Sequence, residues 1–518
     1  MGMGIGMMSG GSGGHGRPAI AAWAAVVLAV CTWTVSSTAP AGEIGREMSP
    51  GAKPAEYDPS VFKSDPDYSD KPYDSERQLE IYGGKRAIDD PRPVFEIGRR
   101  QYVEGPFGAT ATPFGRKNEL IPGLMVFGDW RTAIAYNDNG GKEQGLVATR
   151  LNLDIDLKLT ATERIHAFVG PLDQNNKFTR CAFSADDDDT CELELDGNLE
   201  TLFFEGDLGA ITAGLTDEYV GFDLPFAAGL TPLLFQNGVW LEDAMTGFAV
   251  ALPALNSPKL DISNMDFTFF AGFDKVTTAA MLDTNGKLAD HSVNLYGVAA
   301  FLEVLGGYSE LGIGYTDGED GLDQFDYVNL TAAFTRRYGG WLSNSVRFVW
   351  NVGQDPDNNR QDTADGYIVL VENSLITHKP LTLIPYLNAW VGIDRPQSLA
   401  RAAGAGGILK NTGINFETDG LTGFPKLDDT GRNTFGAALG IEYLFDLHQQ
   451  IVAEVAVLQV IEGNNEAGRP AKGDQYGFGI RYQLPLTRAW IARVDAMYGV
   501  REFDDDFSGM RFEFRRKF

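Results

Sequence analysis

The chain has 518 residues, of which 43% are hydrophobic and 61 are glycine, and its formal net charge at pH 7 is −28. A charge this negative argues against nucleic acid or anionic lipid as a ligand. After the first 41 residues no stretch is apolar enough to cross a bilayer as a helix, and the apolar residues are instead dispersed in alternation, as in membrane β-barrels.

Residues 1–41 have the pattern of a secretory signal peptide. Arg17 is the only charged side chain, an apolar run extends from Ala19 to Val35, and Ala39-Pro40-Ala41 fits an A-x-A cleavage site. The apolar run is short for a membrane helix. The sequence therefore predicts export of a chain that begins after Ala41.

Residues 42–121 are rich in proline, aspartate, tyrosine and lysine and show little periodicity. Only the stretch from Val94 to Gln101 has the character of a strand. We expect a polar N-terminal extension rather than barrel wall. Two placements stay open, a periplasmic extension and a plug inside a lumen.

A period-two pattern begins after Pro122-Gly123 and continues to the end of the chain. In its clearest segment, Val147, Thr149, Leu151, Leu153, Ile155 and Leu157 alternate with Arg150, Asn152, Asp154, Asp156 and Lys158. Strands of soluble sheets rarely alternate for so long, whereas a strand that crosses a membrane needs about 9–11 residues. We find eighteen such segments, beginning near residues 124, 146, 165, 198, 211, 246, 265, 292, 307, 326, 343, 366, 382, 435, 450, 474, 488 and 510.

The last segment carries the most specific signal. Met510, Phe512, Phe514 and the terminal Phe518 share one face, and Arg511, Glu513, Arg515 and Lys517 share the other. A strand of this kind ending in phenylalanine resembles the assembly signal of Gram-negative outer-membrane β-barrels. Over residues 122–518 the chain resembles outer-membrane porins and, by strand number, the larger substrate-porin or alginate-export kind. The resemblance implies an all-β transmembrane antiparallel barrel of 16–18 strands in the outer membrane of a Gram-negative bacterium, and our count of segments gives 18.

Connections between the segments alternate in length, as expected for short periplasmic turns and long outer loops. Among the short turns we expect a hairpin that joins Leu199–Glu205 to Ala210–Leu215 through residues 206–209, and a longer exception at Pro253–Asn264. The longest outer loop, residues 394–434, is the strongest candidate to fold inward and narrow a channel. Residues 219–245 compete with it, because their apolar side chains need burial.

If the apolar faces meet lipid, the opposite faces line the lumen. A basic ladder facing carboxylates resembles the way general porins set an electric field across a water-filled constriction. The alternative is that these charges pair with one another and simply solvate the lumen. The pore-lining candidates are Asp129, Arg131, Arg150, Asp154, Asp156, Arg347, Glu442, Glu454, Arg481, Arg493, Asp495, Arg511 and Arg515.

Cysteine, metal and catalytic patterns add little further chemistry. Cys181 and Cys191 form a close pair in an exported chain, which predicts a disulfide. The acidic run Asp186–Asp189 lacks the spacing of a calcium loop, so we predict no metal and no cofactor. No histidine has an obvious serine partner in the mature chain, so we do not expect an enzyme.

These features favour an outer-membrane channel for passive or substrate-selective diffusion of small hydrophilic solutes. Acidic outer loops favour cations or neutral solutes, while the basic ladder favours anions, so the solute stays open. The sequence also leaves open whether copies of the chain form a homo-oligomer. The alternative function is a structural or partner-docking barrel whose lumen is occupied by residues 42–121 or by another protein. The partners expected in either case are outer-membrane lipid and no nucleic acid.

Overall fold

The computed structural model describes residues 91–98, 117–174, 177–184, 188–197, 199–283, 285–356, 361–412, 420–445, 448–461 and 473–518. The chain divides into two compact units, residues 1–74 and 75–518, and all described elements belong to the second. Most of the predicted signal peptide and N-terminal extension therefore lies outside the described residues. Within those residues, no helix is both long enough and apolar enough to cross a membrane.

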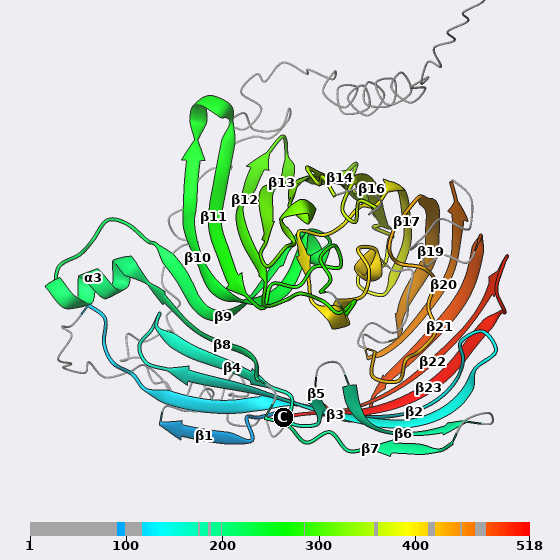
Figure 1. Cartoon of the computed structure of the whole chain (residues 1–518). Coiled ribbons are helices and arrows are strands. Elements are labelled where there is room, and N and C mark those ends of the chain that lie inside the picture. Colours follow the sequence, from blue (N-terminus) through cyan, green and yellow to red (C-terminus); the bar gives the residue numbers. More distant parts are fainter. Residues whose placement is uncertain are drawn as a thin grey trace, which may run out of the picture. The chain divides into compact units, whose positions relative to one another are not determined.

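Eighteen antiparallel strands form a closed barrel (Figure 1). In chain order they are β2 (Gly123–Asp138), β3 (Glu143–Lys158), β4 (Arg164–Val169), β8 (Leu199–Asp207), β9 (Pro225–Phe235), β10 (Leu241–Ser257), β11 (Ile262–Asp274), β12 (Val293–Val304), β13 (Gly307–Gly318), β14 (Tyr327–Tyr338), β15 (Leu342–Val352), β16 (Gly366–Leu375), β17 (Leu383–Asp394), β19 (Thr434–Phe445), β20 (Gln449–Val460), β21 (Gln475–Pro485), β22 (Trp490–Arg501) and β23 (Phe507–Lys517). Each pairs with the next, and β23 closes the barrel on β2, with Phe512 opposite Ile134.

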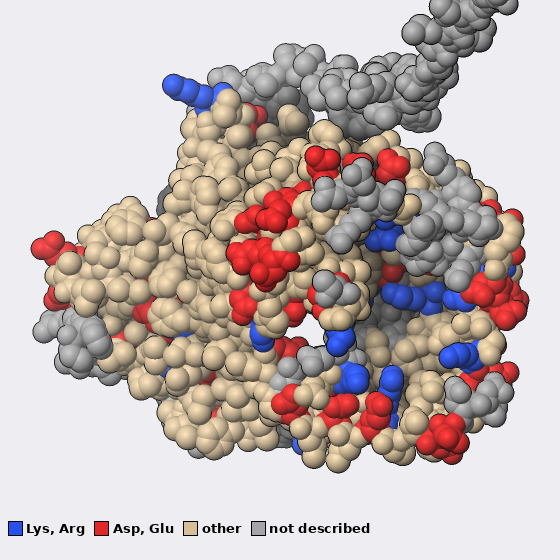
Figure 2. All heavy atoms as spheres, in the orientation of Figure 1, with Lys and Arg blue, Asp and Glu red and all other residues tan. Residues whose placement is uncertain are grey.

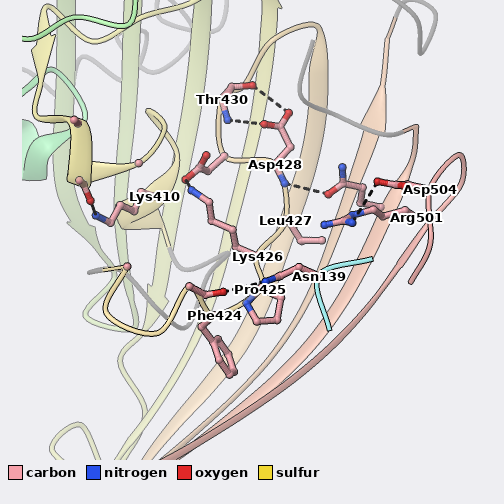
Figure 3. Close-up of a pocket in the computed structure, with 17 residues that line it drawn as sticks. Asn139, Lys410, Phe424, Pro425, Lys426, Leu427, Asp428, Thr430, Arg501 and Asp504 are labelled. Carbon is pink, nitrogen blue, oxygen red and sulfur yellow. Dashed lines mark hydrogen bonds and ion pairs between the residues drawn. The ribbon is translucent and has the colours of Figure 1, made fainter. Parts of the chain in front are cut away.

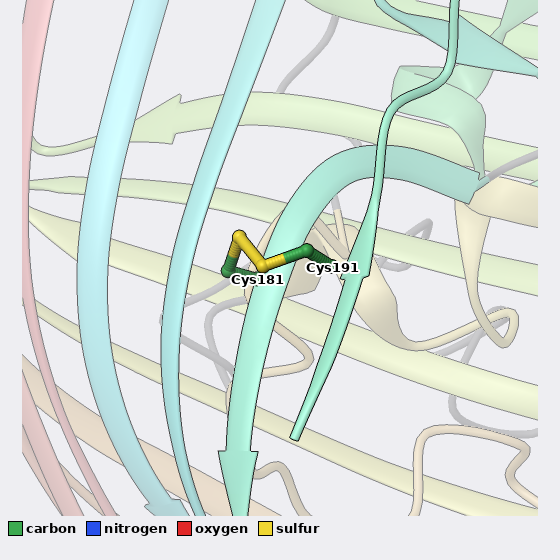
Figure 4. The surroundings of a disulfide bond; sticks show 2 residues. All are labelled: Cys181 and Cys191. Carbon is green, nitrogen blue, oxygen red and sulfur yellow. A yellow bond between two sulfur atoms is a disulfide. The ribbon is translucent and has the colours of Figure 1, made fainter.

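Smaller elements attach to this wall. They are β1 (Phe95–Gly98), β5 (Asp173–Gln174), β6 (Lys177–Ser184), β7 (Thr190–Glu192), β18 (Ala400–Arg401), the helix α3 (Leu208–Thr216) and the 3₁₀ turns η2 (Gln236–Gly238), η3 (Pro258–Leu260), η4 (Asp323–Phe325), η5 (Ala403–Ala405) and η6 (Lys410–Thr412). β6 pairs with the part of β3 that β4 leaves unpaired, and β7 pairs with β6. A disulfide joins Cys181 on β6 to Cys191 on β7 (Figure 4).

The barrel is apolar outside and polar inside. On β2 and β23 most outward side chains are apolar, with Ile134 57% and Met510 61% exposed. Their chain neighbours Ala133 and Arg511 face inward and are 0% and 1% exposed. A soluble protein shows the opposite distribution, so the outer surface of this barrel matches lipid.

Two predicted connections are wrong. The segment near residue 211, expected as the fifth strand of a hairpin, is the helix α3, and the fifth wall strand is β9, inside the expected outer loop 219–245. Asp207 explains the helix, because its side chain accepts a hydrogen bond from the Ala210 backbone N–H and caps the first turn. The expected long turn at Pro253–Asn264 is tight, since β10 and β11 extend to either side of η3.

The exterior pattern predicts the effect of charge on the wall. Ile134→Lys places an ammonium against the hydrocarbon and should lower the free energy of unfolding in lipid vesicles by about 2–4 kcal/mol. Leu193→Lys, at an exposed residue beyond β7, is the control and should change it by less than ~0.5 kcal/mol. Denaturant unfolding followed by tryptophan fluorescence measures both. Equal effects would contradict a lipid-facing position for Ile134.

Candidate functional site in the lumen

Between β17 and β19, the described residues 395–412 and 420–433 turn into the barrel, and we call them the inner loop. Leu399 and Ala400 pack against β10 and β12, within a core that includes Trp240, Leu241 and Leu295. Farther along, the inner loop contacts β15 to β20 through Ile408 and Leu409, β22 and the start of β23 through Phe424 and Leu427, and β2 and β3 through Leu421. The loop therefore lines much of the lumen, as the sequence suggested for residues 394–434.

The tip of the hairpin formed by β9 and β10 also occupies part of the lumen. At its tip Trp240 donates a hydrogen bond to the Asn329 side chain at 2.8 Å and packs against Phe235 and Phe270. The Trp240 carbonyl accepts a 2.7 Å hydrogen bond from the Leu399 backbone, which ties hairpin and inner loop together. Of the apolar residues in the stretch 219–245, Trp240 and Leu241 are thus buried and Leu233 and Phe235 pack against them, whereas Phe222 and Leu234 are exposed.

Five arginines gather on the inner face of four neighbouring strands, and we call them the basic cluster. They are Arg131 on β2, Arg481 on β21, Arg493 on β22, and Arg511 and Arg515 on β23. The register sets Asp495 directly between Arg481 and Arg511. Asp495 lies 2.6 Å from Arg481 Nε, 2.7 Å from Arg511 Nη2 and 3.3 Å from Arg493 Nε.

Two further carboxylates complete the network. Glu513 Oε2 lies 3.1 Å from Arg493 Nη2. Asp129 Oδ2 lies 3.0 Å from Arg515 Nε and 3.3 Å from Arg131 Nε. At these distances three carboxylates contact the five guanidinium groups, and Glu454 also interacts electrostatically with Arg481.

Three arginines of the cluster, Arg481, Arg493 and Arg515, are more exposed than the carboxylates that they contact. The side chains of Arg481 and Arg515 are 23% and 34% exposed, whereas that of Asp495 is 0% exposed. Arg511 is fully buried and packs under the Phe424 ring of the inner loop, with its guanidinium carbon 5.7 Å from the ring centre. On β21 to β23 the exposed charges of the cluster are therefore those of Arg481, Arg493 and Arg515.

On another part of the wall the carboxylates are more exposed than the arginines that they contact. Arg347 on β15 is more buried than its partners Glu372 on β16, at 2.7 Å, and Glu310 on β13, at 3.6 Å. Arg401 in the inner loop is likewise more buried than its partner Glu242, at 3.2 Å. We call Glu242, Glu310 and Glu372 the acidic side.

β13 and β23 are nine wall strands apart in an 18-strand barrel, so they face each other across the lumen. In Figure 2 acidic and basic side chains gather around a central hollow.

The remaining predicted residues lie outside the basic cluster. Arg150 pairs with Asp173 at 2.7 Å and Glu200 at 2.9 Å, and Asp156 lies 3.5 Å from Arg164. Glu454 accepts a hydrogen bond from the Tyr386 hydroxyl at 2.5 Å, and Glu442 accepts one from Gln450 at 2.5 Å. Asp154 lies on the same face of β3 as Asp156.

A cavity of about 640 Å³ lies between the inner loop and the outer ends of β2, β21 and β22 (Figure 3). Three cationic side chains line it. Lys410 donates to the Gly404 carbonyl at 2.8 Å, Lys426 pairs with Asp429 at 2.6 Å, and Arg501 lies 3.5 Å from Asp504. Phe424, Pro425 and Leu427 add an apolar surface. The cavity thus combines charged and apolar groups at the end of the lumen that carries the longer loops.

Asp428 fixes the inner loop beside this cavity. Its backbone N–H donates to the Gln475 side chain at 3.0 Å, and its carboxylate accepts hydrogen bonds from the Thr430 backbone N–H and hydroxyl, both at 3.1 Å. Burial raises the pKa of Asp428 to about 6, although the hydrogen bonds from Thr430 act to lower it. Because docking raises the pKa of Asp428, the protonated carboxyl stabilises the docked loop more than the ionised carboxylate does.

Sequence reasoning did not select several residues of this lumen. Glu513, Glu310 and Glu372 hold arginines but were not among the candidates, and Phe424 lies in a loop without periodicity. A register argument would have found Glu513, because β22 and β23 place it opposite Arg493. Asp186 and Asp187 lie outside the described residues, and in the part of the chain that the structure describes no group of three His, Cys, Asp or Glu side chains is arranged to hold a metal ion.

Removing the carboxylate at the centre of the cluster tests its structural role. Asp495→Asn leaves three guanidinium groups without their shared counter-charge, which should reduce the free energy of unfolding by on the order of 3 kcal/mol. Asp504→Asn, at a half-exposed pair near the outer rim, should cost at most about 1 kcal/mol. Both are measured by denaturant unfolding in vesicles, and equal costs would contradict the central position of Asp495.

The raised pKa of Asp428 predicts a pH dependence of loop docking. In the undocked loop Asp428 loses its proton above its ordinary pKa of 3.8. In the docked loop Asp428 keeps this proton up to a pKa of about 6. Docking is therefore strongest below pH 4, weakens as pH rises to about 6, and changes little above it. Hydrogen exchange of residues 420–430, corrected for intrinsic rates, should be faster at pH 7 than at pH 4.5. Asp428→Asn should remove most of this difference, and an undiminished difference would contradict the assignment.

Comparisons with known proteins add structural neighbours at low identity. No family model matches the chain, and no curated relative matches it. Among solved structures, OccK2 (OpdF) of Pseudomonas aeruginosa has a TM-score of 0.48 at 12% identity, over 76% of this chain and 97% of that one. OpdL of the same organism has a TM-score of 0.47 at 12% identity, over 76% and 98%. The outer-membrane protein OpdK, also from P. aeruginosa, has a TM-score of 0.45 at 13% identity, over 76% and 98%.

The classification follows from the barrel itself. Its wall closes without a free edge, its exterior is apolar, its interior is charged, and its connections are mostly short on one side and long on the other. Eighteen strands fall in the size range of porins, whose lumen is wide enough for water. The chain is an 18-strand β-barrel of the Gram-negative outer membrane.

Proposed function

We propose that the barrel is a passive diffusion channel for small hydrophilic solutes. The observation that carries this proposal is the water-facing charge inside the barrel. Arg481, Arg493 and Arg515 are partly exposed in the lumen although the carboxylates that hold them are buried. In a barrel of this size whose lumen is fully occupied by protein, we would expect the inward charges to be buried and paired rather than solvated.

The inner loop and the tip of the β9–β10 hairpin narrow this channel. Both are held by buried apolar contacts and by backbone hydrogen bonds, such as that from Leu399 to Trp240. A fixed constriction limits the size of the solute, whereas a mobile surface loop would not. The channel we propose therefore excludes large solutes by its shape.

The two charged parts of the lumen act on the solute together. The basic cluster presents cationic groups on β21 to β23, and the acidic side presents carboxylates on β10, β13 and β16. Opposite charges across a water-filled passage create a field perpendicular to the pore. Charged and zwitterionic solutes would align in that field, and anions would pass along the basic cluster.

Ion selectivity tests this proposal. The purified protein should give stepwise conductance in a planar bilayer. In a salt gradient, Arg481→Gln/Arg493→Gln should move the reversal potential toward cation selectivity, and Glu310→Gln/Glu372→Gln should move it toward anion selectivity. The shifts should be opposite because each pair removes the water-facing charge of one side.

Arg516→Gln is the matched control. Arg516 lies on the outward face of β23, with its guanidinium carbon 5.3 Å from the centre of the Trp490 ring, so its loss should leave the potential unchanged. A heat-modifiable band on a denaturing gel shows that each variant is folded. Absence of conductance in the wild type would contradict the channel, and shifts in the same direction would contradict the field.

A further inference from the structure

The helix α3 occupies an unusual place in this barrel. It connects β8 to β9 at the end of the wall where most other connections are tight turns, such as Leu305-Gly306 between β12 and β13. Figure 1 shows α3 outside the wall, beyond the ends of β8 and β9. Short turns of bacterial barrels lie on the periplasmic side, which places α3 near the inner leaflet of the outer membrane.

Hydrogen bonds attach α3 firmly to the wall. The two carboxylate oxygens of Asp207, the last residue of β8, accept from the backbone N–H of Ala210 at 2.7 Å and of Leu224 at 2.8 Å. The Leu208 N–H donates to the Leu224 carbonyl at 3.1 Å. Gly209 allows close approach, because a Cβ there would meet the Phe222 carbonyl at 2.0 Å. The helix is thus held against the returning chain rather than free in solution.

The surface of α3 is suited to an apolar environment. The helix contains no charged residue, and Leu208, Ile211 and Leu215 recur at the spacing of one helical face. Leu215 is 68% exposed. The polar side chains are satisfied within the helix, since the hydroxyls of Thr212 and Thr216 donate to the carbonyls four residues earlier at 2.7 and 2.8 Å.

The apolar surface of α3 continues the lipid-facing surface of the wall. On the adjoining strands Leu202 faces outward and is exposed, and Phe204 packs against Phe226 with ring centres 5.7 Å apart. Beyond the helix, Tyr219 and Phe222 are exposed. Aromatic side chains of this kind gather where hydrocarbon meets the headgroups.

We propose that α3 is an interfacial helix that lies in the headgroup–acyl boundary of the bilayer beside the barrel. Leu208, Ile211 and Leu215 enter the acyl region, and Asp217 and Glu218 end the segment in water. The bilayer is the occupant because this surface adjoins the lipid-facing wall. Another protein or a second copy of the chain is the competing occupant.

Fluorescence quenching tests the proposal on the chain expressed from residue 42 onward, which lacks Cys31. Cys181 and Cys191 are joined, so a cysteine introduced as Leu215→Cys can then be labelled alone with an environment-sensitive dye. In phosphatidylcholine vesicles the dye should emit at shorter wavelength than in water. It should be quenched by lipids carrying a shallow spin label and protected from iodide. Ile313→Cys, on the lipid-facing wall, and Lys142→Cys, in an outer turn, provide the two reference states.

Three outcomes would overturn the proposal. Emission and iodide quenching equal to those of Lys142→Cys would place α3 in water. Protection that appears only at high protein-to-lipid ratio would assign the surface to a second copy. Protection that requires added periplasmic extract would assign it to a protein partner. Heat-modifiable migration of each labelled variant shows that the barrel is folded.

Discussion

Every strand of this barrel places alternate side chains against lipid, and this constraint governs the rest of the structure. Charged groups are costly where the outer face meets hydrocarbon, so most of them point into the lumen, where partial burial makes an unpaired charge costly. Asp495 shows the consequence, since one carboxylate lies within ion-pair distance of Arg481, Arg493 and Arg511. The same pairing leaves Arg481 and Arg493 partly exposed to the lumen, so the network that stabilises the wall also places charge there.

The same constraint, that alternate side chains face lipid, also determines how the lumen is filled. The inner loop and the β9–β10 hairpin bring their own apolar side chains, and these find apolar surroundings only by packing on one another and on small inward residues of the wall. Gly312 is one such residue, since Trp240 occupies the space that a Cβ there would need, and Gly314 stands in the same relation to Leu399. The lumen is therefore narrowed by a second hydrophobic core within a polar barrel.

The sequence predicted the wall well because its period of two is strong and repeated, and β3 and β23 show it over most of their length. It failed at Ala210–Leu215, where small apolar residues fit a helix as well as a strand, and at β9, whose Pro225, Gly229 and Pro232 resemble loop composition. The candidate site was only partly predictable. Inward-facing charges can be identified from alternation, but which carboxylate holds which arginine depends on register, and the contacts of Leu399 and Phe424 depend on tertiary packing.

Single-channel conductance after removal of the inner loop tests the central claim most directly. Gly392 on β17 is paired with Thr434 on β19, so a short turn can replace residues 398–431 without disturbing the wall. If the loop narrows the channel, the shortened protein should keep its heat-modifiable migration and show a several-fold larger conductance step. An unchanged step in a folded barrel would show that the loop does not limit the passage and would contradict this account.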